Sequence, residues 1–270
     1  MDATPAEIKQ ELTAALDRLA ALSGIQRVRR AARAALDVRG GQRLLDAGCG
    51  AGEEARELAR LVGADGAVTA IDLSTDLVAA ARRRDEGSGV RYAVGDITAL
   101  DFPDATFDSV RAERVLQHLA DPDAAIAELI RVTVPGGRVC LIDTDWESFL
   151  VDGMPGDVFS ELQRQGRELG VIKPAGRQLR GRLVRAGLTA VTAEPVAIPI
   201  CDRRTAETLH PFLDQALPGR IAQIPGELAD PWFSALKDAL GRNERSVSPW
   251  RFRSHSNRST TDADHQGPGP

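Results

Sequence analysis

Apolar residues follow two different periodicities along the chain, and the change falls near residue 40. Before that point they recur at helical spacing, as at Leu12, Leu16 and Leu19. Ser23 and Gly24 interrupt this pattern, which therefore predicts two successive helices. After it, short apolar runs alternate with amphipathic segments, which is typical of strands and helices in alternation.

The alternating region predicts a doubly wound α/β fold. Five apolar runs predict strands, at Arg43–Ala47, Ala67–Ile71, Val90–Val94, Thr106–Arg111 and Arg138–Ile142. Helices are expected between them at Gly52–Val62, Thr75–Arg84 and Pro122–Val132. Strands and helices that alternate with short connections favour a Rossmann-like, mostly parallel sheet covered on both faces.

Beyond about residue 143 the pattern becomes mainly helical. Helices are expected at Pro155–Leu169, Arg177–Ala186, Thr205–Leu217 and Pro231–Leu240, and a longer strand at Val191–Ile200. The last residues are polar and predict a disordered tail. We therefore expect a helical N-terminal lid over residues 1–40 and a main domain over 41–250. Lid helices are expected around 147–186 and 203–241, and the tail over 251–270.

Composition gives no support for several classes of partner. A formal net charge of -5 gives no reason to expect nucleic acid or an anionic membrane as a partner. No apolar run reaches the roughly 20 residues of a membrane span, and the first residues lack the pattern of a signal peptide, so we expect a cytoplasmic protein. The three cysteines and four histidines are too scattered for a metal cluster, so no metal is expected.

The first strand runs directly into a glycine-rich segment, Gly48-Cys49-Gly50-Ala51-Gly52, and then into a helix. Glycines at such a turn let the backbone approach a ligand without a Cβ clash. The following helix start offers unpaired N–H groups to an anionic group. Glycine turns of this kind have many uses, so the segment alone indicates no particular ligand.

Two acids after the turn indicate a nucleoside. Asp72 ends the second strand about 20 residues beyond the glycines, the spacing expected for a carboxylate that accepts ribose hydroxyls. Asp96 follows the third strand, where it could accept from an adenine amine. A single aspartate at a strand end is commonly a cap or turn residue. Successive strand ends that each carry an acid are harder to explain in that way.

Asp46, just before the glycines, indicates which nucleotide binds. A carboxylate there would repel the pyrophosphate of a dinucleotide but help to hold a cationic amino group, directly or through water. S-adenosylmethionine has no phosphate and carries an ammonium and a sulfonium group, so the acid favours it over NAD. A P-loop is excluded because no Gly-Lys-Ser/Thr follows the turn.

Residues from about 43 to 146 resemble the class I S-adenosylmethionine-dependent methyltransferases, especially the branch of ubiquinone and menaquinone methyltransferases and bacterial small-molecule enzymes. The matching segments are Leu45-Asp46-Ala47-Gly48-Cys49-Gly50, Ile71-Asp72, Gly95-Asp96, Phe102–Asp108, Val115–Leu119 and Arg131–Gly137. The resemblance implies a sheet of about seven strands whose last strand is antiparallel. In this chain the corresponding segment contains Pro249 and alternating arginines, which predicts that the last strand is weak or absent.

The resemblance also implies the roles of individual residues. Asp46, Gly48 and Gly50 would hold the methionine portion, and Glu113 would lie near its amino group. Asp72 and Leu73 would hold the ribose, and Asp96 and Ile97 the adenine. The arginine-rich run from Ile25 to Arg30 is either a solvated helix face or a lid whose Gln26 or Arg27 meets the cofactor carboxylate.

The expected reaction is in-line methyl transfer to N, O or C of a small-molecule acceptor, by a monomer or homodimer. His118 is a candidate general base, oriented by Asp143, although it could equally be a structural residue. Trp146 and Phe149 could line an acceptor pocket or belong to the core. A non-catalytic or impaired cofactor-binding relative, a protein or nucleic-acid methyltransferase and, more distantly, an NAD-dependent oxidoreductase remain as alternatives.

Overall fold

The computed structural model describes residues 14, 16–148, 156–168 and 173–198, and structural statements below concern these residues. Their centre is a parallel sheet of five strands in the order β3-β2-β1-β4-β5. The strands are β1 (Arg43–Ala47), β2 (Ala67–Asp72), β3 (Arg91–Val94), β4 (Phe107–Glu113) and β5 (Thr133–Ile142). This arrangement confirms the predicted Rossmann-like α/β class.

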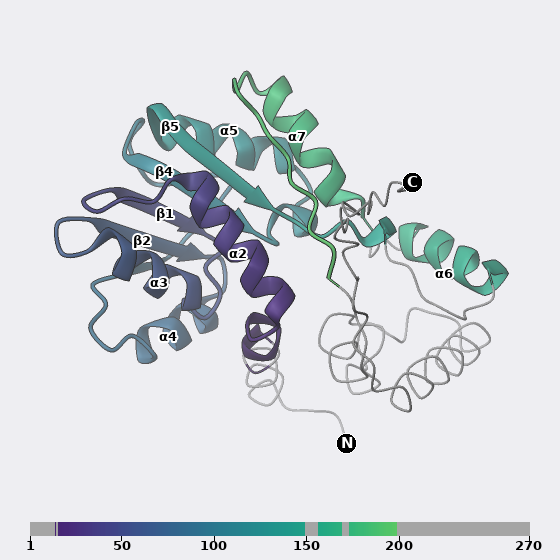
Figure 1. Ribbon diagram of the computed structural model, residues 1–270, viewed down its shortest axis with the longest axis horizontal. Helices are drawn as coiled ribbons and strands as arrows, with labels where there is room; N and C mark the ends of the chain where they lie inside the picture. The colour runs from purple at the N-terminus through teal and green to yellow at the C-terminus, as the bar shows by residue number, and fades with distance from the viewer. Residues whose placement is uncertain (1–13, 15, 149–155, 169–172, 199–270) are drawn as a thin grey trace, which may run out of the picture.

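Helices cover both faces of the sheet (Figure 1). On one side lie α2 (Ser23–Leu36), α3 (Glu53–Val62) and α4 (Thr75–Arg83); on the other lie α5 (Pro122–Val132) and α7 (Ala175–Arg185). Two short 3₁₀ helices, η1 (Leu116–His118) and η2 (Trp146–Ser148), follow β4 and β5, and α6 is Gly156–Glu168. None of the described helices is both long and apolar enough to cross a membrane.

Local sequence explains where several of these helices begin. Ser74 caps α4, because its hydroxyl accepts a hydrogen bond from the backbone N–H of Leu77 at 3.3 Å. Asp121 caps α5 in the same way through the N–H groups of Asp123 and Ala124, and Pro122 occupies the first helical position. These signals are visible in the sequence, which is why the predicted helix starts agree with the structure.

The period of two along the strands divides the core into two layers. Leu45 and Val110 point toward the α5 side, where they pack in one cluster with Leu129. Leu44 belongs to a second cluster on the other face, together with Leu58 of α3. The central strands are therefore buried on both faces, and their carboxyl ends meet at one edge of the sheet.

The strand predicted at Val191–Ile200 does not join the sheet in its described part. Residues 191–198 form no strand pairing, and Pro195 lacks the N–H that an interior strand residue would donate. The segment lies against α2 instead: Arg27 donates a hydrogen bond to the carbonyl of Ala197 at 3.1 Å. The predicted helices Thr205–Leu217 and Pro231–Leu240, the last strand and the tail lie outside the described residues.

Candidate functional site

The glycine turn after β1 is shaped by three left-handed backbone positions. Gly48, Gly50 and Gly52 have φ values of 82°, 55° and 78°. A Cβ on Gly48 would lie 2.1 Å from Cγ2 of Val115, so a side chain cannot be accommodated there without movement. The N–H of Gly48 donates to the carbonyl of Ile71 at 2.8 Å, which ties the turn to the end of β2.

Asp72 holds the glycine turn from the end of β2. Its Oδ2 accepts from the N–H of Gly50 at 2.9 Å, and its Oδ1 accepts from the N–H of Ser74 at 2.9 Å. Each carboxylate oxygen can accept more than one hydrogen bond, so both keep capacity for a ligand hydroxyl. Beside it, Leu73 is 72% exposed and Val94 is 50% exposed, which leaves apolar surface uncovered at the ends of β2 and β3.

Asp96 and Ile97, after β3, have separate environments. Asp96 is exposed and accepts hydrogen bonds from both the N–H and the hydroxyl of Thr98 through Oδ1, which lowers its pKa. Asp96 is therefore a turn residue, as the general behaviour of strand-end aspartates suggests. The side chain of Ile97 is buried in the core on the α5 side, so only its backbone is placed to meet a nucleoside.

Asp46 is paired with an arginine that the sequence prediction did not include. Asp46 and Arg111 are neighbours across β1 and β4, and Nη1 of Arg111 lies 2.9 Å from Oδ1 of Asp46. Both side chains are 2% exposed. Burial raises the pKa of Asp46 to about 6 in spite of the opposing charge of Arg111. Asp46 is thus held in the sheet through one oxygen, Oδ1, by this buried pair.

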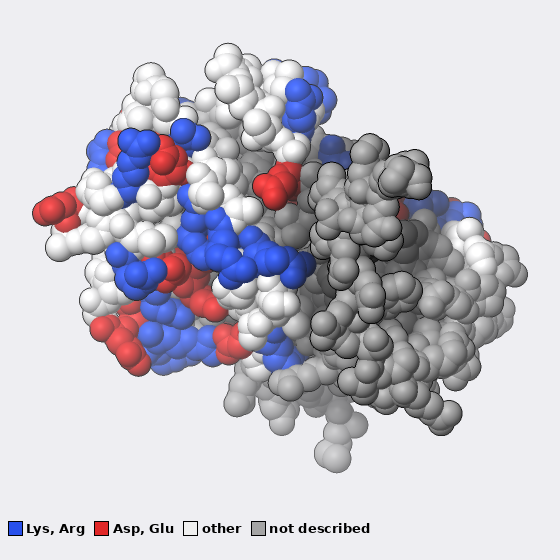
Figure 2. All heavy atoms as spheres, viewed as in Figure 1, with Lys and Arg blue, Asp and Glu red and all other residues white. Residues whose placement is uncertain are grey.

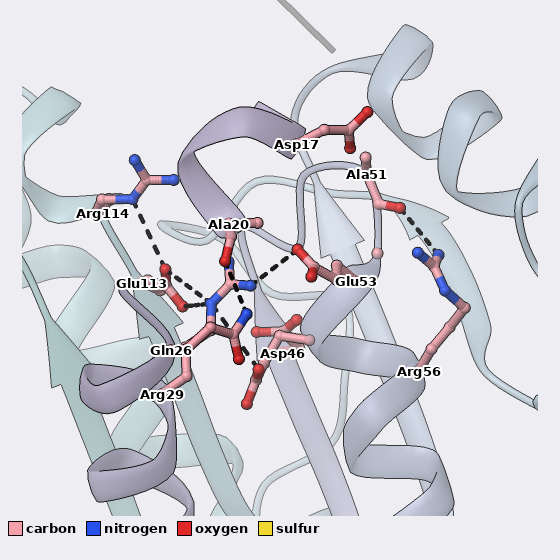
Figure 3. Close-up of polar contacts among 12 residues, drawn as sticks. Asp17, Ala20, Gln26, Arg29, Asp46, Ala51, Glu53, Arg56, Glu113 and Arg114 are labelled. Carbon is pink, nitrogen blue, oxygen red and sulfur yellow. Dashed lines mark hydrogen bonds and ion pairs between the residues drawn. The ribbon is translucent and has the colours of Figure 1, made fainter. Parts of the chain in front are cut away.

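Glu113, at the end of β4, is the centre of the same network (Figure 3). Its Oε2 lies 2.6 Å from Nη2 of Arg111 and 2.9 Å from Nε of Arg29 on α2. Burial opposes ionisation of Glu113, but Arg111 and Arg29 outweigh it and lower its pKa to about 2. The carboxylate therefore stays charged and fastens α2 across the end of β4.

The network continues to the first turn of α3. Arg29 also bonds Glu53 at 3.0 Å, and Arg33 bonds Glu54 at 2.8 Å. A charged hollow of about 490 Å³ lies between α2 and α3, and its lining includes these four residues and Gln26, the candidate lid residue. Acidic and basic atoms interleave over α3 on the visible face in Figure 2. The interface between α2 and α3 is therefore largely ionic.

Comparisons with known proteins agree with this geometry. The family described as methyltransferase domain matches residues 45–141. A 27-O-demethylrifamycin SV methyltransferase of Amycolatopsis mediterranei is 33% identical over 203 residues, which cover 73% of this chain and 67% of that protein. The chain belongs to the class I S-adenosylmethionine-dependent methyltransferases.

Other matches support the same family and fold. An uncharacterized 37.1 kDa protein in transposon TN4556 of Streptomyces fradiae is 37% identical, with 71% of this chain and 56% of that protein covered. A ubiquinone/menaquinone biosynthesis C-methyltransferase of Teredinibacter turnerae is 37% identical over 110 residues, 39% of this chain and 44% of that enzyme. The chain thus spans about half the length of these two curated relatives.

The crystal structure of the [4+2]-cyclase SpnF has the same fold, with a TM-score of 0.57 and 24% identity, over 90% of this chain and 93% of that one.

The family's methyl donor, S-adenosylmethionine, is compatible with the residues present. The uncovered apolar surface of Leu73 and Val94 beside the carboxylate of Asp72 suits an adenosine. The charged network below Gly48 suits the ammonium and carboxylate of a methionine. Within the described chain, no group of three or more acids, histidines or cysteines is arranged to hold a metal ion.

His118 does not form the predicted pair with Asp143. The indole N–H of Trp146 can only donate, and it donates to Oε1 of Gln117 at 3.0 Å. The other end of the Gln117 side chain is therefore the amide nitrogen, which lies 3.0 Å from Nε2 of His118. That ring nitrogen must therefore accept. Trp146 serves as a link between η2 and η1, and the lone pair of His118 at Nε2 is already occupied.

Arg29 and Arg111 are the residues that sequence reasoning missed. Arg111 lies between Val110 and Ala112 in the buried part of the central strand β4, and a charge at such a position signals a buried partner of opposite sign. Arg29 lies on the buried face of α2 with Ile25, Ala32 and Leu36, at spacings of a helix. Of the predicted lid contacts, Gln26 donates a hydrogen bond to the carbonyl of Ala20 at 2.7 Å, and Arg27 donates one to the carbonyl of Ala197.

Proposed function

We propose that this chain transfers the methyl group of S-adenosylmethionine to N, O or C of a small-molecule acceptor. The observation that carries the proposal is the carboxylate of Asp72, tied to the turn at Gly50 and flanked by the uncovered side chain of Leu73. Relatives whose names specify a rifamycin and a quinone as acceptors support the small-molecule class.

The cofactor is proposed to lie across the carboxyl ends of β1, β2 and β3. Asp72 and Leu73 would hold the ribose, and Asp96 with the backbone of Ile97 the adenine. The turn at Gly48 and Gly50 would hold the methionine portion, whose amino group lies toward Glu113. Asp46 would contribute by keeping Arg111, and through it Glu113, in place.

Bound S-adenosylmethionine supplies a sulfonium methyl group, which is already a strong electrophile. The protein's residues need only bind the cofactor, hold the acceptor in line with the methyl group and exclude water. Arg29 and Glu113 fasten α2 over the methionine end, which would exclude water from that side.

A methyl-transfer screen tests the proposal. The full chain is incubated with S-adenosylmethionine and separate amine, phenol and quinol acceptors, and the demethylated cofactor is quantified. We expect acceptor-dependent turnover that disappears in Asp72→Ala and persists in Asp76→Ala, a matched change on the exposed start of α4. Cofactor binding without turnover on any acceptor would favour the alternative of a non-catalytic relative. Absence of cofactor binding would reject the proposal.

A further inference from the structure

Buried polar atoms without a hydrogen-bond partner are concentrated at one edge of the sheet. In the described chain there are six, all on β1 and β4 or on residues that directly follow β4 and β5: Asp46 Oδ2, Arg111 Nε, Arg114 Nε, both oxygens of Asp143, and Asp145 Oδ1. Buried polar groups are normally paired, so unpaired ones in a cluster indicate a place that a ligand or water completes.

Four of these six atoms lie beyond the expected cofactor. In the sheet order β3-β2-β1-β4-β5, adenosine is placed over β3 and β2 and methionine over β1. The next positions along the edge are the ends of β4 and β5, where Arg114 and Asp143 lie. The acceptor must approach the sulfonium from that side, because the other side is occupied by the cofactor itself.

The backbone around Asp143 is firmly positioned. The N–H of Gly176, at the start of α7, donates to the carbonyl of Thr144 at 3.3 Å. A Cβ on Gly176 would lie 2.7 Å from the carbonyl oxygen of Asp143, so α7 packs directly on this loop. On the other side, Arg114 adopts a left-handed φ of 56°, and its backbone N–H donates a hydrogen bond to the carbonyl of Ile142 at 2.7 Å. Strained residues held in this way concentrate at functional sites.

We infer that Asp143, rather than His118, is the general base of the reaction and takes the proton of a hydroxyl or amine acceptor. This inference rests on the proposed function. His118 already accepts from Gln117 at Nε2, whereas both oxygens of Asp143 are shielded from solvent and unpaired in the described structure. A shielded carboxylate without a donor is suited to accept a proton from a bound O–H or N–H.

The step is balanced. The acceptor oxygen or nitrogen forms a bond to the methyl carbon as the carbon–sulfur bond breaks and its electron pair returns to sulfur. The sulfonium becomes a neutral thioether, and the proton of the acceptor passes to the carboxylate of Asp143. The cationic donor, neutral acceptor and anionic carboxylate thus give three neutral products, and the proton later leaves Asp143 to water.

The charges around Asp143 fit this role. Burial raises its pKa to about 7. The backbone N–H groups of Gln117 and Leu116, which lie near the carboxylate without meeting hydrogen-bond geometry, and the guanidinium of Arg114 act in the opposite direction. Glu113 adds a smaller raising effect. Asp145 is itself paired with Arg177 of α7 at 2.6 Å. A base with a pKa near neutrality works best near neutral pH.

The test measures kcat, KM and the pH profile of methyl transfer from S-adenosylmethionine to phenol and primary-amine probes by the full chain. Asp143→Asn is expected to lower kcat by roughly 10²-fold or more, the usual contribution of a general base, and to remove the rise of kcat through pH 7. Asp123→Asn, an equivalent change on α5, is expected to alter neither. Calorimetry with S-adenosylmethionine should give the same affinity for all three proteins.

Several results would overturn the inference. These are an unchanged kcat and pH profile in Asp143→Asn, a larger loss in His118→Ala, or wild-type turnover on carbon acceptors alone. A second readout applies to any acceptor: the ¹³C carboxyl resonance of Asp143, assigned with Asp143→Asn, should titrate near pH 7 in cofactor-saturated protein and shift when a phenol or amine probe is added. Titration below pH 5, or no response to either probe, would also overturn it. Failure to bind S-adenosylmethionine would instead reject the proposed function.

Discussion

At the scale of single residues, buried charge is the unusual feature of this chain. Asp46, Arg111 and Glu113 occupy sheet positions that most proteins of this architecture fill with apolar side chains. A buried ion pair seldom makes a protein more stable than an apolar replacement would, but loss of one partner leaves the other charge buried without compensation. We infer that the network is kept because it positions Glu113 and α2 near the cofactor.

Arg111→Met tests the buried network. The change leaves Asp46 without its partner and Glu113 with Arg29 and the more distant Arg114, and we expect it to lower the free energy of unfolding by about 3–5 kcal/mol. Arg84→Met, which removes the surface pair with Asp17, should cost at most about 1 kcal/mol. Urea unfolding of both variants measures the difference. Equal effects would show that the buried pair has no special role.

Asp143 predicts a pH dependence of stability. Its pKa is about 7 in the folded protein, above the ordinary aspartate value of 3.8, so the folded state holds the proton over a pH range in which the unfolded state loses it. Stability therefore falls as pH rises from about 4 to about 7. Asp143→Asn cannot ionise and should gain stability relative to wild type across this window. Urea unfolding of both proteins at several pH values measures this gain. A stability difference between Asp143→Asn and wild type that does not change with pH would contradict the raised pKa of Asp143.

At the scale of elements, the glycine turn and α2 define the methionine end of the site. Gly48→Ala tests the turn. A residue with a Cβ loses about 1–2 kcal/mol of stability at the left-handed φ of Gly48, and the clash of that Cβ with Val115 removes about 1–3 kcal/mol more. Gly187→Ala, at the left-handed residue that ends α7, has a similar φ of 89° and no neighbour within 4 Å, so it should show only the cost of the left-handed backbone. Thermal unfolding and calorimetry with S-adenosylmethionine compare the two. Equal losses would contradict the close approach of Val115.

Arg29→Met tests the clamp on α2. The substitution keeps the apolar stem but removes the bonds to Glu113 and Glu53. We expect faster hydrogen exchange of α2 amides and weaker binding of S-adenosylmethionine. Arg30→Met, on the exposed face of the same helix, is the matched control and should leave both unchanged. Unaltered α2 exchange in Arg29→Met would show that apolar packing alone holds the helix.

Periodicity predicted the central elements well because local signals determine them. The five strands and the helices between them agree to within a few residues, since each apolar run and each cap, such as Ser74, acts locally. The segment at Val191–Ile200 was predicted wrongly because Pro195 removes a donor that its apolar pattern does not reveal. The partners of Arg29, Arg111 and His118 depend on contacts between distant elements, which periodicity cannot supply.

At the scale of the whole molecule, one edge of the sheet is divided between two tasks. The ends of β1, β2 and β3 present the glycine turn, Asp72 and uncovered apolar surface, which suit the cofactor. The ends of β4 and β5 present unpaired polar atoms, including those of Asp143, which suit an acceptor. Family membership supports the first region as the cofactor site. The identity of the acceptor depends on the second region.

The cofactor assignment can be tested by calorimetric titration of the full chain with S-adenosylmethionine, repeated with NAD and with Asp72→Asn. We expect S-adenosylmethionine to bind at one site and NAD to produce no binding heat. Asp72→Asn should weaken binding by about ten- to a hundredfold, as expected for loss of a charged hydrogen-bond acceptor. Binding of NAD but not of S-adenosylmethionine, or equal affinity in Asp72→Asn, would contradict the assignment of this site.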